Sequence, residues 1–253
     1  MTPKRDDFFI GYLGRLPAAA RGPIWMFAAA LLAGFVGGAF AFSAGQPDPG
    51  DGRWIRQGQR VEGVMRADPY PHIRTAPDAE HPAGRAHLLV TGVKRGVQGA
   101  ARRLDGRIVQ TGGQWLRRGS AEMLQVGRRI QAKQSAGPAF ETPVEELGRW
   151  RLSGEICDGK CYLGIMRPGV GLAHKACANL CVKGGVPPVL VLEQPVKVDG
   201  LETVFILLAD AEGKAVGDVL YDLVALLVRL EGALERHGDM LVLRTDLSRA
   251  EAL

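Results

Sequence analysis

The chain has 253 residues, and 46% of them are hydrophobic, a proportion typical of a globular protein and too high for a disordered one. Its 34 glycines favour turns and short strands over long helices. The formal net charge is +5 and the isoelectric point is about 9.2, a basic balance that would fit a nucleic-acid partner. The N-terminal segment argues against such a partner.

Residues 24–44 form a stretch of 21 residues without a charge. A helix of this length covers about 30 Å, the thickness of the hydrocarbon layer of a bilayer. A cleaved signal peptide has a shorter apolar region that begins closer to the N-terminus, whereas 23 residues precede this stretch. We therefore expect a retained transmembrane helix at 24–44 that anchors the protein in the lipid bilayer.

The charges beside this span predict its orientation. Four basic side chains precede it, and Asp48 and Asp51 follow it closely. The positive-inside rule then predicts a cytoplasmic N-terminus at 1–23 and an exported body. We expect a single-pass protein of a bacterial inner membrane with its C-terminal body in the periplasm, where no nucleic acid is encountered.

Breaks in the hydrophobic pattern divide the rest of the chain. A Gly-, Pro- and charge-rich linker is predicted at 45–59 and a second linker at 131–147. Between and after them the pattern is strand-like, which predicts a mainly β protein. The predicted domains are a first β-barrel at 60–130 and a second at 148–247, followed by a tail at 248–253.

Nine strands are predicted in these two domains. They cover 60–65, 87–93, 106–117 and 121–126 in the first, and 149–157, 189–193, 204–209, 225–236 and 240–245 in the second. Their number, their mid-strand glycines and the size of each half fit small barrels of the oligonucleotide/oligosaccharide-binding (OB) type. A fold of this kind does not dictate a function.

The two halves resemble loose copies of one another. The segment around Gly63 matches that around Gly154, and residues 88–90 match 206–208. Near the end, Val109-x3-Gly113 matches Val228-x3-Gly232, and Met123-Leu124 matches Met240-Leu241. The common order of these matches predicts an internal duplication. Only the second copy carries a cysteine-rich insert, because its expected counterpart at 68–84 has no cysteine.

The two halves differ in charge. Residues 53–133 carry 16 Lys and Arg against 6 Asp and Glu, a net charge of +10, whereas residues 140–253 carry 12 against 17, a net charge of −5. Such a difference either serves solubility or directs the basic half to anionic lipid headgroups or an acidic partner. The candidate partner- or lipid-facing residues are Arg102, Arg103, Arg117 and Arg118.

All four cysteines and one of the five histidines fall between residues 157 and 181. The segment 172–182 lacks proline and can form a helix, on which His174, Cys177 and Cys181 project within an arc of about 60°. Cys161 can complete a four-ligand set with them. The predicted metal or redox site is therefore Cys161, His174, Cys177 and Cys181, with Cys157 and Met166 as additional ligands or, for Cys157, a disulfide partner.

Three interpretations of this segment stay open. An oxidising compartment favours two structural disulfides. One disulfide beside a metal or redox site is the second interpretation, and sulfur with imidazole selects copper or zinc. The third is a four-ligand zinc or iron–sulfur site, although the spacings differ from those of zinc ribbons and ferredoxins. The Cys-x-x-Cys-His motif of covalent haem attachment is absent from the sequence.

The remaining histidines and tryptophans are weaker candidates. His72, His81, His87 and His237 are scattered and are expected at the surface or in turns. Trp115 and Trp150 are expected in the barrel cores, and Asp158 in a turn.

The run Cys161-Tyr-Leu-Gly-x-Met-x-Pro-Gly-x-Gly-x-x-His174-x-x-Cys177-Ala-x-x-Cys181-x-x-Gly-Gly-x-Pro-Pro188 resembles a motif of bacterial membrane-anchored proteins of unknown function. The N-terminal run Asp-Phe-Phe-Ile-Gly-Tyr-Leu is also similar to the start of such proteins. The resemblance implies that Cys161, His174, Cys177 and Cys181 form the core set, without Cys157. It implies proximity to respiratory or molybdenum-type oxidoreductases and no particular activity.

Together these patterns predict a membrane-anchored periplasmic accessory or assembly subunit of a respiratory or redox system, whose insert binds a metal or docks a partner in a membrane redox complex. Two alternatives stay open. The protein can be a thiol-based redox protein or metallochaperone, or a scaffold without catalytic activity whose cysteines form structural disulfides.

Overall fold

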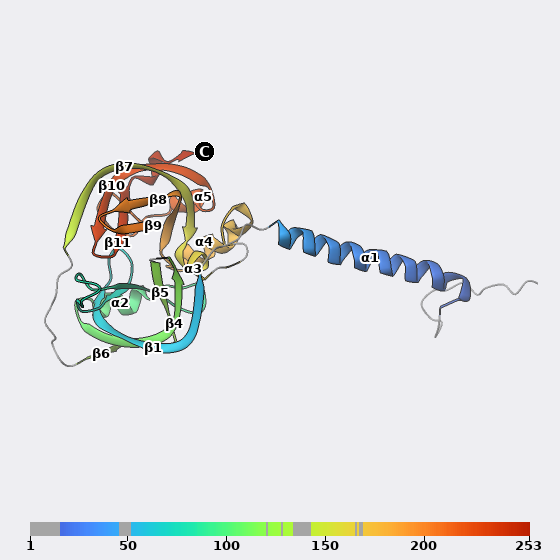
Figure 1. The fold of residues 1–253 in the computed structure, drawn as a ribbon, viewed down its shortest axis with the longest axis horizontal. Helices are drawn as coiled ribbons and strands as arrows, with labels where there is room; N and C mark the ends of the chain where they lie inside the picture. Colours follow the sequence, from blue (N-terminus) through green and yellow to red (C-terminus); the bar gives the residue numbers. More distant parts are fainter. Residues whose placement is uncertain are drawn as a thin grey trace, which may run out of the picture. The chain divides into compact units, whose positions relative to one another are not determined.

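The computed structural model describes residues 16–45, 52–119, 121–127, 129–133, 143–164, 166 and 169–253. The chain divides into an N-terminal unit, Met1–Asp48, and a compact body, Pro49–Leu253. Figure 1 shows that the body consists of two β-rich halves that follow one another along the chain. Each unit is described by itself.

The N-terminal unit contains one long helix, α1, at Ala18–Ala44. Its most apolar window has a mean hydropathy of 2.0, and none of its residues is buried. By length and composition this helix can cross a membrane. It begins six residues before the predicted span at 24–44, because the alanines at 18–20 favour helix as strongly as the apolar residues that follow.

The first half of the body is a closed five-stranded barrel. Its strands are β1 (Arg53–Arg66), β2 (His72–Arg74), β3 (Ala86–Val90), β4 (Ile108–Arg118) and β5 (Ala121–Val126). They follow the order β1-β2-β3-β5-β4, and pairing of β1 with β4 closes the barrel. Strands β3 and β5 run parallel, and helix α2 (Gln98–Leu104) precedes β4. A short strand, β6 (Gln131–Ala132), extends the sheet beside β4.

The second half repeats this topology. Its strands are β7 (Val144–Asp158), β8 (Pro188–Val198), β9 (Leu201–Ala209), β10 (Leu227–His237) and β11 (Met240–Thr245), with β12 (Glu251–Ala252) beside β10. The order is β7-β8-β9-β11-β10, β10 pairs with β7, and β9 runs parallel to β11. A short helix, α5 (Leu220–Leu223), takes the place of α2. The predicted mainly β fold with two small closed barrels is confirmed.

The register of the strands tests the predicted duplication. Gly63 pairs with Val109 as Gly154 pairs with Val228, so these matches are confirmed. A Cβ atom at Gly63 would lie 2.2 Å from the carbonyl oxygen of Arg74, and one at Gly154 would lie 2.4 Å from a backbone oxygen of β8. Both positions therefore require glycine because two backbones approach each other closely.

Two of the predicted matches are wrong in register. Leu88 pairs with Met123 in the first barrel, as Leu207 pairs with Val242 in the second. Residues 88–90 are therefore equivalent to 207–209 and not to 206–208. Met123 consequently corresponds to Val242 and not to Met240. These strands are almost entirely apolar, so no alternation of polar and apolar residues marks their register.

The boundaries also differ from the prediction. Strand β1 begins at Arg53, inside the predicted linker at 45–59, and β6 and the start of β7 occupy both ends of the linker predicted at 131–147. Residues 134–142 of that linker lie outside the described residues. The predicted tail at 248–253 contains part of the 3-10 turn η2 (Leu247–Arg249) and strand β12.

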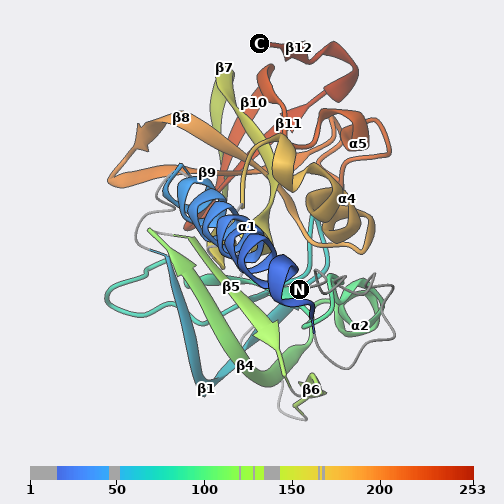
Figure 2. The ribbon, with the colours of Figure 1, turned by 90° about the vertical axis from the view of Figure 1, so that its right-hand side faces the viewer.

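The cysteine-rich insert connects β7 with β8, where the first barrel has only residues 67–71 between β1 and β2. Its true counterpart is thus shorter than the predicted 68–84. The insert forms helix α3 (Gly159–Leu163), the 3-10 turn η1 (Leu172–His174) and helix α4 (Lys175–Lys183). Helix α4 lies beside α5 (Figure 2), where Asn179 donates a hydrogen bond to the Tyr221 carbonyl at 3.1 Å.

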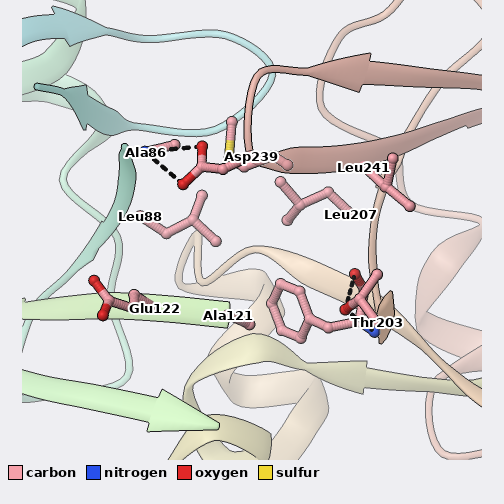
Figure 3. A pocket seen from close by; sticks show the side chains of 10 residues that line it. Ala86, Leu88, Ala121, Glu122, Thr203, Leu207, Asp239 and Leu241 are labelled. Carbon is pink, nitrogen blue, oxygen red and sulfur yellow. Dashed lines mark hydrogen bonds between the residues drawn. The ribbon is translucent and has the colours of Figure 1, made fainter. Parts of the chain in front are cut away.

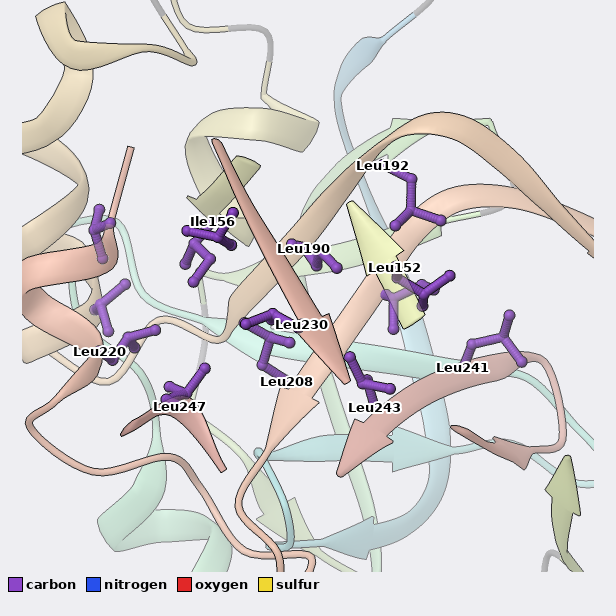
Figure 4. Packing of buried hydrophobic residues seen from close by; sticks show 14 of the residues in the cluster. Leu152, Ile156, Leu190, Leu192, Leu208, Leu220, Leu230, Leu241, Leu243 and Leu247 are labelled. Carbon is purple, nitrogen blue, oxygen red and sulfur yellow. The ribbon is translucent and has the colours of Figure 1, made fainter. Parts of the chain in front are cut away.

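Each barrel has its own apolar core, and a third core joins them. Figure 4 shows the leucine-rich core of the second barrel, which includes Leu190 and Leu230. The third core combines Leu116 and Met123 of the first barrel with residues of the second barrel and with Leu163 of α3. Burying a side chain of this size contributes about 1.5–3 kcal/mol. The insert therefore packs between the barrels and joins them into one body.

Candidate functional site

Three cysteines of the insert meet at one point. Cys161 comes from α3, and Cys177 and Cys181 come from α4. Their Sγ atoms lie within 4.8 Å of one another, and all are free thiols. Cys161 and Cys181 are buried, whereas Cys177 is half-buried and gives access from solvent. We call these three residues the thiol cluster.

The Sγ atoms of Cys161 and Cys181 lie 3.9 Å apart. This distance is far longer than the bond of about 2.05 Å in a disulfide. It is close to the separation of about 3.8 Å between two thiolates that share a tetrahedral metal ion with bonds of about 2.3 Å. The cluster is thus spaced as a metal-binding set of sulfur atoms is spaced.

Local helix geometry builds the cluster. Asp158 caps α3 by accepting a hydrogen bond from the Cys161 backbone N–H at 2.8 Å, which fixes Cys161 in the first turn. Cys177 and Cys181 are four residues apart on α4, so their side chains lie on one helix face. The predicted helix at 172–182 is confirmed, although its first turn is the 3-10 turn η1.

His174 lies beside the thiol cluster and is held by Asp158. The His174 Nε2 atom is 2.9 Å from the Asp158 Oδ2 atom, and both side chains are buried. Asp158, Cys161 and His174 form a second group of ligand atoms within 4.8 Å, so Cys161 belongs to both groups. The prediction placed His174 with Cys177 and Cys181, but the 3-10 turn that contains His174 breaks the regular helical spacing.

The first barrel supplies a positive charge to the cluster. Lys94, in the loop after β3, donates a hydrogen bond from its Nζ atom to the Cys177 Sγ atom at 2.8 Å. This contact raises the pKa of Lys94, which keeps it charged. A second lysine, Lys160, is buried and donates to the carbonyls of Thr91 at 2.7 Å and Gly92 at 3.1 Å. Asp158, Lys94 and Lys160 are the three residues of the site that sequence reasoning missed.

The two buried cysteines of the cluster differ in the direction of their pKa shifts. A hydrogen bond from Cys161 lowers the pKa of Cys181, with a further contribution from the charge of Lys94. The same hydrogen bond raises the pKa of Cys161, and burial adds to that effect. Cys181 is therefore the first of the two to become a thiolate, which is the form that attacks a disulfide or binds a metal ion.

Cys157 and Met166 lie outside the thiol cluster. Cys157 is buried in the core between the barrels, and its Sγ atom donates to a Glu155 carboxylate oxygen at 3.3 Å. Burial raises the pKa of this thiol. Met166 is 45% exposed, and its backbone N–H donates to the Cys161 carbonyl at 3.1 Å. The structure therefore groups neither residue with the predicted ligands.

The four candidate arginines divide into two pairs. Arg102 and Arg103 lie in the last turn of α2 and are exposed. The guanidinium of Arg118 lies 4.0 Å from the Tyr162 ring centroid, and Arg117 forms an ion pair with Glu122. Among the described residues, Arg102 and Arg103 therefore make neither an ion pair nor a contact with an aromatic ring, whereas Arg117 and Arg118 do.

Two of the four scattered histidines contradict the expectation of surface or turn positions. His72 and His87 are each only 6% exposed, because β2 and β3 carry them inside the body. His81 and His237 are partly exposed. Trp115 is buried as predicted, whereas Trp150 is partly buried at the edge of its core.

A small cavity of about 30 Å³ lies where the barrels meet (Figure 3). Glu122 from β5 and Asp239 from the β10–β11 turn line it. Asp239 accepts hydrogen bonds from the Ala86 backbone N–H at 3.0 and 3.1 Å, and from Arg74 at 2.6 Å. The cavity has room for a water molecule and is too small for a substrate.

The chain matches no protein-family model, no curated protein and no solved structure. The thiol cluster and its two lysines are therefore interpreted from geometry and charge.

Proposed function

We propose that this protein is a membrane-anchored accessory protein whose body binds a thiophilic metal ion at the thiol cluster. The observation that carries this proposal is the group of three free sulfur atoms within 4.8 Å of one another. Soft sulfur ligands select copper(I) and zinc over hard cations. Cys177 is half-buried, so an ion can reach the cluster from solvent.

Charge balance allows either copper(I) or zinc. Three thiolates carry three negative charges, and Lys94 and Lys160 compensate two of them. The remaining charge is −1, which copper(I) neutralises, or −2 when the buried Asp158 carboxylate beside Cys161 is counted, which zinc neutralises. Uncompensated buried charge is costly. We therefore keep copper(I) and zinc as the two candidate ions.

The wider role follows from the anchor and the insert. Helix α1 can hold the body at a membrane, and a site that is reachable at Cys177 suits an ion that is taken up and passed on. We propose a periplasmic body on a bacterial inner membrane that serves as an accessory or assembly subunit of a respiratory or redox complex.

Elemental analysis of the full-length protein, purified in detergent without oxygen, tests the metal site. We expect about one copper or zinc ion per chain, in keeping with a single three-sulfur set. Cys177→Ser should lose the ion while the body stays folded, because Cys177 is the least buried of the three. Cys157→Ala, which changes a buried thiol outside the cluster, should retain it. The proposal fails if neither ion binds, or if both variants lose it equally.

A thiol–disulfide function is the second candidate, favoured by the lowered pKa of Cys181 and its 3.9 Å separation from Cys161. Because Cys181 is 0% exposed, this reaction requires α4 to move and expose it. The Cys181 thiolate then attacks a disulfide of a partner protein, which breaks that bond and releases one partner thiolate. The Cys161 sulfur then displaces the second partner thiolate and forms a Cys161–Cys181 disulfide. Two electrons pass to the partner, and the proton of Cys161 goes to a released thiolate.

A thiol count distinguishes the candidates. Protein quenched with acid and alkylated after denaturation should show four thiols if the site holds a metal ion in a reduced cluster. A recoverable population with a Cys161–Cys181 disulfide, reduced by a dithiol and reoxidised by a partner disulfide, would support the redox function. Two permanent disulfides would instead support the purely structural role of the cysteines.

A further inference from the structure

The outer face of the second barrel contains a hollow of about 490 Å³ lined by arginines. Small-molecule sites commonly measure about 300–1,000 Å³. The arginines come from four elements, namely Arg149 and Arg151 of β7, Arg229 of β10, Arg244 of β11 and Arg249 of η2. We call this feature the arginine hollow. The hollow lies in residues 140–253, whose net charge is −5, so five arginines gather in a part of the chain that is acidic as a whole.

Strand geometry places these side chains together. Arg149 and Arg151 are two residues apart on β7 and therefore point to the same side of the sheet. On β10, which pairs with β7, Arg229 and Glu231 share that side for the same reason. Gly232 and Ala233 of β10 also line the hollow, and neither carries a side chain large enough to fill it.

The acidic residues of the hollow leave positive charge unbalanced. Glu231 is shared by Arg149 at 3.0 Å and Arg151 at 3.4 Å. Glu251 pairs with Arg229 at 3.2 Å. With Asp246, the lining contains three carboxylates against five guanidinium groups, a net charge of +2.

Two of the arginines lack a carboxylate partner inside the hollow. Arg244 forms its ion pair with Glu235 at 3.0 Å, and Glu235 is not part of the lining. Arg249 has no ion pair with any residue that the structure describes. Guanidinium donors are therefore left to bind an added anion.

The first barrel provides an internal comparison. When the two barrels are aligned by their strand registers, Gln110 occupies the position equivalent to Arg229. In the same alignment Gly112 is equivalent to Glu231, and Gln125 is equivalent to Arg244. These equivalents carry no charge, although the surrounding half has a net charge of +10. Arg229 and Arg244 are thus properties of the second copy, whereas Arg151 has an arginine, Arg60, at its equivalent position in the first barrel.

From this arrangement we propose that the arginine hollow binds a small phosphate-bearing molecule. The planar fork of an arginine matches the oxygen atoms of a phosphate through two parallel hydrogen bonds. A phosphate monoester carries about −1.5 to −2 charges near pH 7, opposite in sign to the surplus of the hollow, which is +2 for the lining and +1 when Glu235, the partner of Arg244, is counted. The proposal is independent of the thiol cluster and of the function assigned to it.

Calorimetric titration of the full-length protein with inorganic pyrophosphate, at about 0.15 M salt to screen weak surface attraction, tests this site. We expect saturable binding. Arg229→Gln, which installs the residue of the first barrel, should weaken it about tenfold by removing a charge-assisted contact. Lys197→Gln is the control, since Lys197 is likewise ion-paired, with Glu202 at 3.0 Å, and lies away from the hollow, although its side chain is more exposed than that of Arg229 (72% against 40%). This control should leave the affinity unchanged.

Membrane composition identifies the source of the phosphate group. The titration is repeated with the protein in nanodiscs of phosphatidylcholine alone and of phosphatidylcholine with phosphatidic acid. Weaker pyrophosphate binding in the second disc identifies a lipid headgroup as the occupant, whereas equal binding identifies a soluble phosphorylated molecule. Absence of saturable binding, an Arg229→Gln affinity equal to that of the parent, or equally tight binding of malonate overturns the proposal.

Discussion

Burial changes the chemistry of one histidine in this body. His72 on β2 is 6% exposed, and its Nδ1 atom lies 2.9 Å from the Tyr70 carbonyl oxygen, to which it donates when neutral. Burial lowers the pKa of His72 to about 4, and the charges of Arg66, Arg74 and His237 contribute. The folded body therefore holds this imidazole neutral in a pH range where a solvated histidine is charged.

The His72 pKa predicts a loss of stability in mild acid. The folded pKa is about 4, whereas the unfolded chain has a pKa of about 6.5. Above pH 6.5 neither state binds the proton, and as the pH falls towards 4 only the unfolded state does, so the free energy of unfolding decreases by up to about 3 kcal/mol. His72→Gln should remove this part of the decrease.

Urea unfolding followed by tryptophan fluorescence, at about pH 7 and pH 4.5, measures the His72 effect. The comparison is the difference between the two pH values within each protein, so a general loss of stability in the variant does not affect it. His81→Gln changes a partly exposed histidine and serves as the control. Equal acid sensitivity in the parent and in His72→Gln would contradict the assignment.

Asp158 and Lys94 show why part of the site escaped prediction from the sequence. Cysteine and histidine spacing identifies ligand types, and the structure brings three of the predicted residues, Cys161, Cys177 and Cys181, within 4.8 Å of one another. Asp158 looks like an ordinary cap or turn residue in the sequence, and only the fold brings its second oxygen to His174. Lys94 comes from the other barrel, and its contact with Cys177 spans 83 residues. No local pattern carries that information.

At the scale of elements, the end of α4 connects the cluster to the first barrel. Helix α4 is followed by Gly184, whose carbonyl accepts a hydrogen bond from the Gly96 backbone N–H at 2.9 Å. The Gln98 side chain donates to the next carbonyl, that of Gly185, at 2.5 Å. This contact holds the loop of Lys94 against the helix that bears Cys177 and Cys181.

Gly184→Ala tests this connection. The added Cβ atom would lie 1.9 Å from the Lys94 carbonyl oxygen, so the loop must move and carry its ammonium group away from Cys177. We expect a loss of roughly 2–3 kcal/mol in the free energy of unfolding. Metal affinity should fall about 10–100-fold, the usual effect of removing a group that contacts a ligand.

Gly217→Ala is the matched control for Gly184→Ala, because a Cβ atom at Gly217 meets nothing within 4 Å. The two variants are compared by urea unfolding and by competition with a copper(I) chelator. Similar stability and affinity in both variants would show that the contact between α4 and the Lys94 loop is unimportant.

Sequence periodicity predicted the long elements and missed the short ones. Strands such as β4 and β10 have enough residues to show a pattern, whereas β2 has three residues and α5 has four. Elements of this size are stabilised by their neighbours more than by local preference. The mid-strand glycines identified the duplication correctly, since they mark close backbone approaches that both barrels require.

At the scale of the whole molecule, the core between the barrels makes them interdependent. Helix α3 of the insert packs against β4 and β5 of the first barrel, and Tyr70 of the first barrel donates to the Leu208 carbonyl of the second at 2.8 Å. Arg74 adds hydrogen bonds to Asp239 at 2.6 Å and to the His237 carbonyl at 2.8 Å. Two barrels with a shared apolar core and these polar links should unfold as one unit.

Leu230→Ala distinguishes one cooperative unit from two. Leu230 is 1% exposed and belongs to the core inside the second barrel, which has no buried residue in common with the core between the barrels. The cavity left by the smaller side chain should cost about 2–5 kcal/mol. If the barrels unfold together, hydrogen exchange of the slowest amides becomes faster in β3, β4 and β5 of the first barrel as well as in β8 and β9, and the change corresponds to the same free energy in both barrels.

Leu227→Ala is the control, because Leu227 is on the same strand but 38% exposed, and its substitution should change exchange in both barrels little. Faster exchange confined to the second barrel would show that the insert joins two independently stable domains, and the thiol cluster would then lie at a separable interface and not inside a single body.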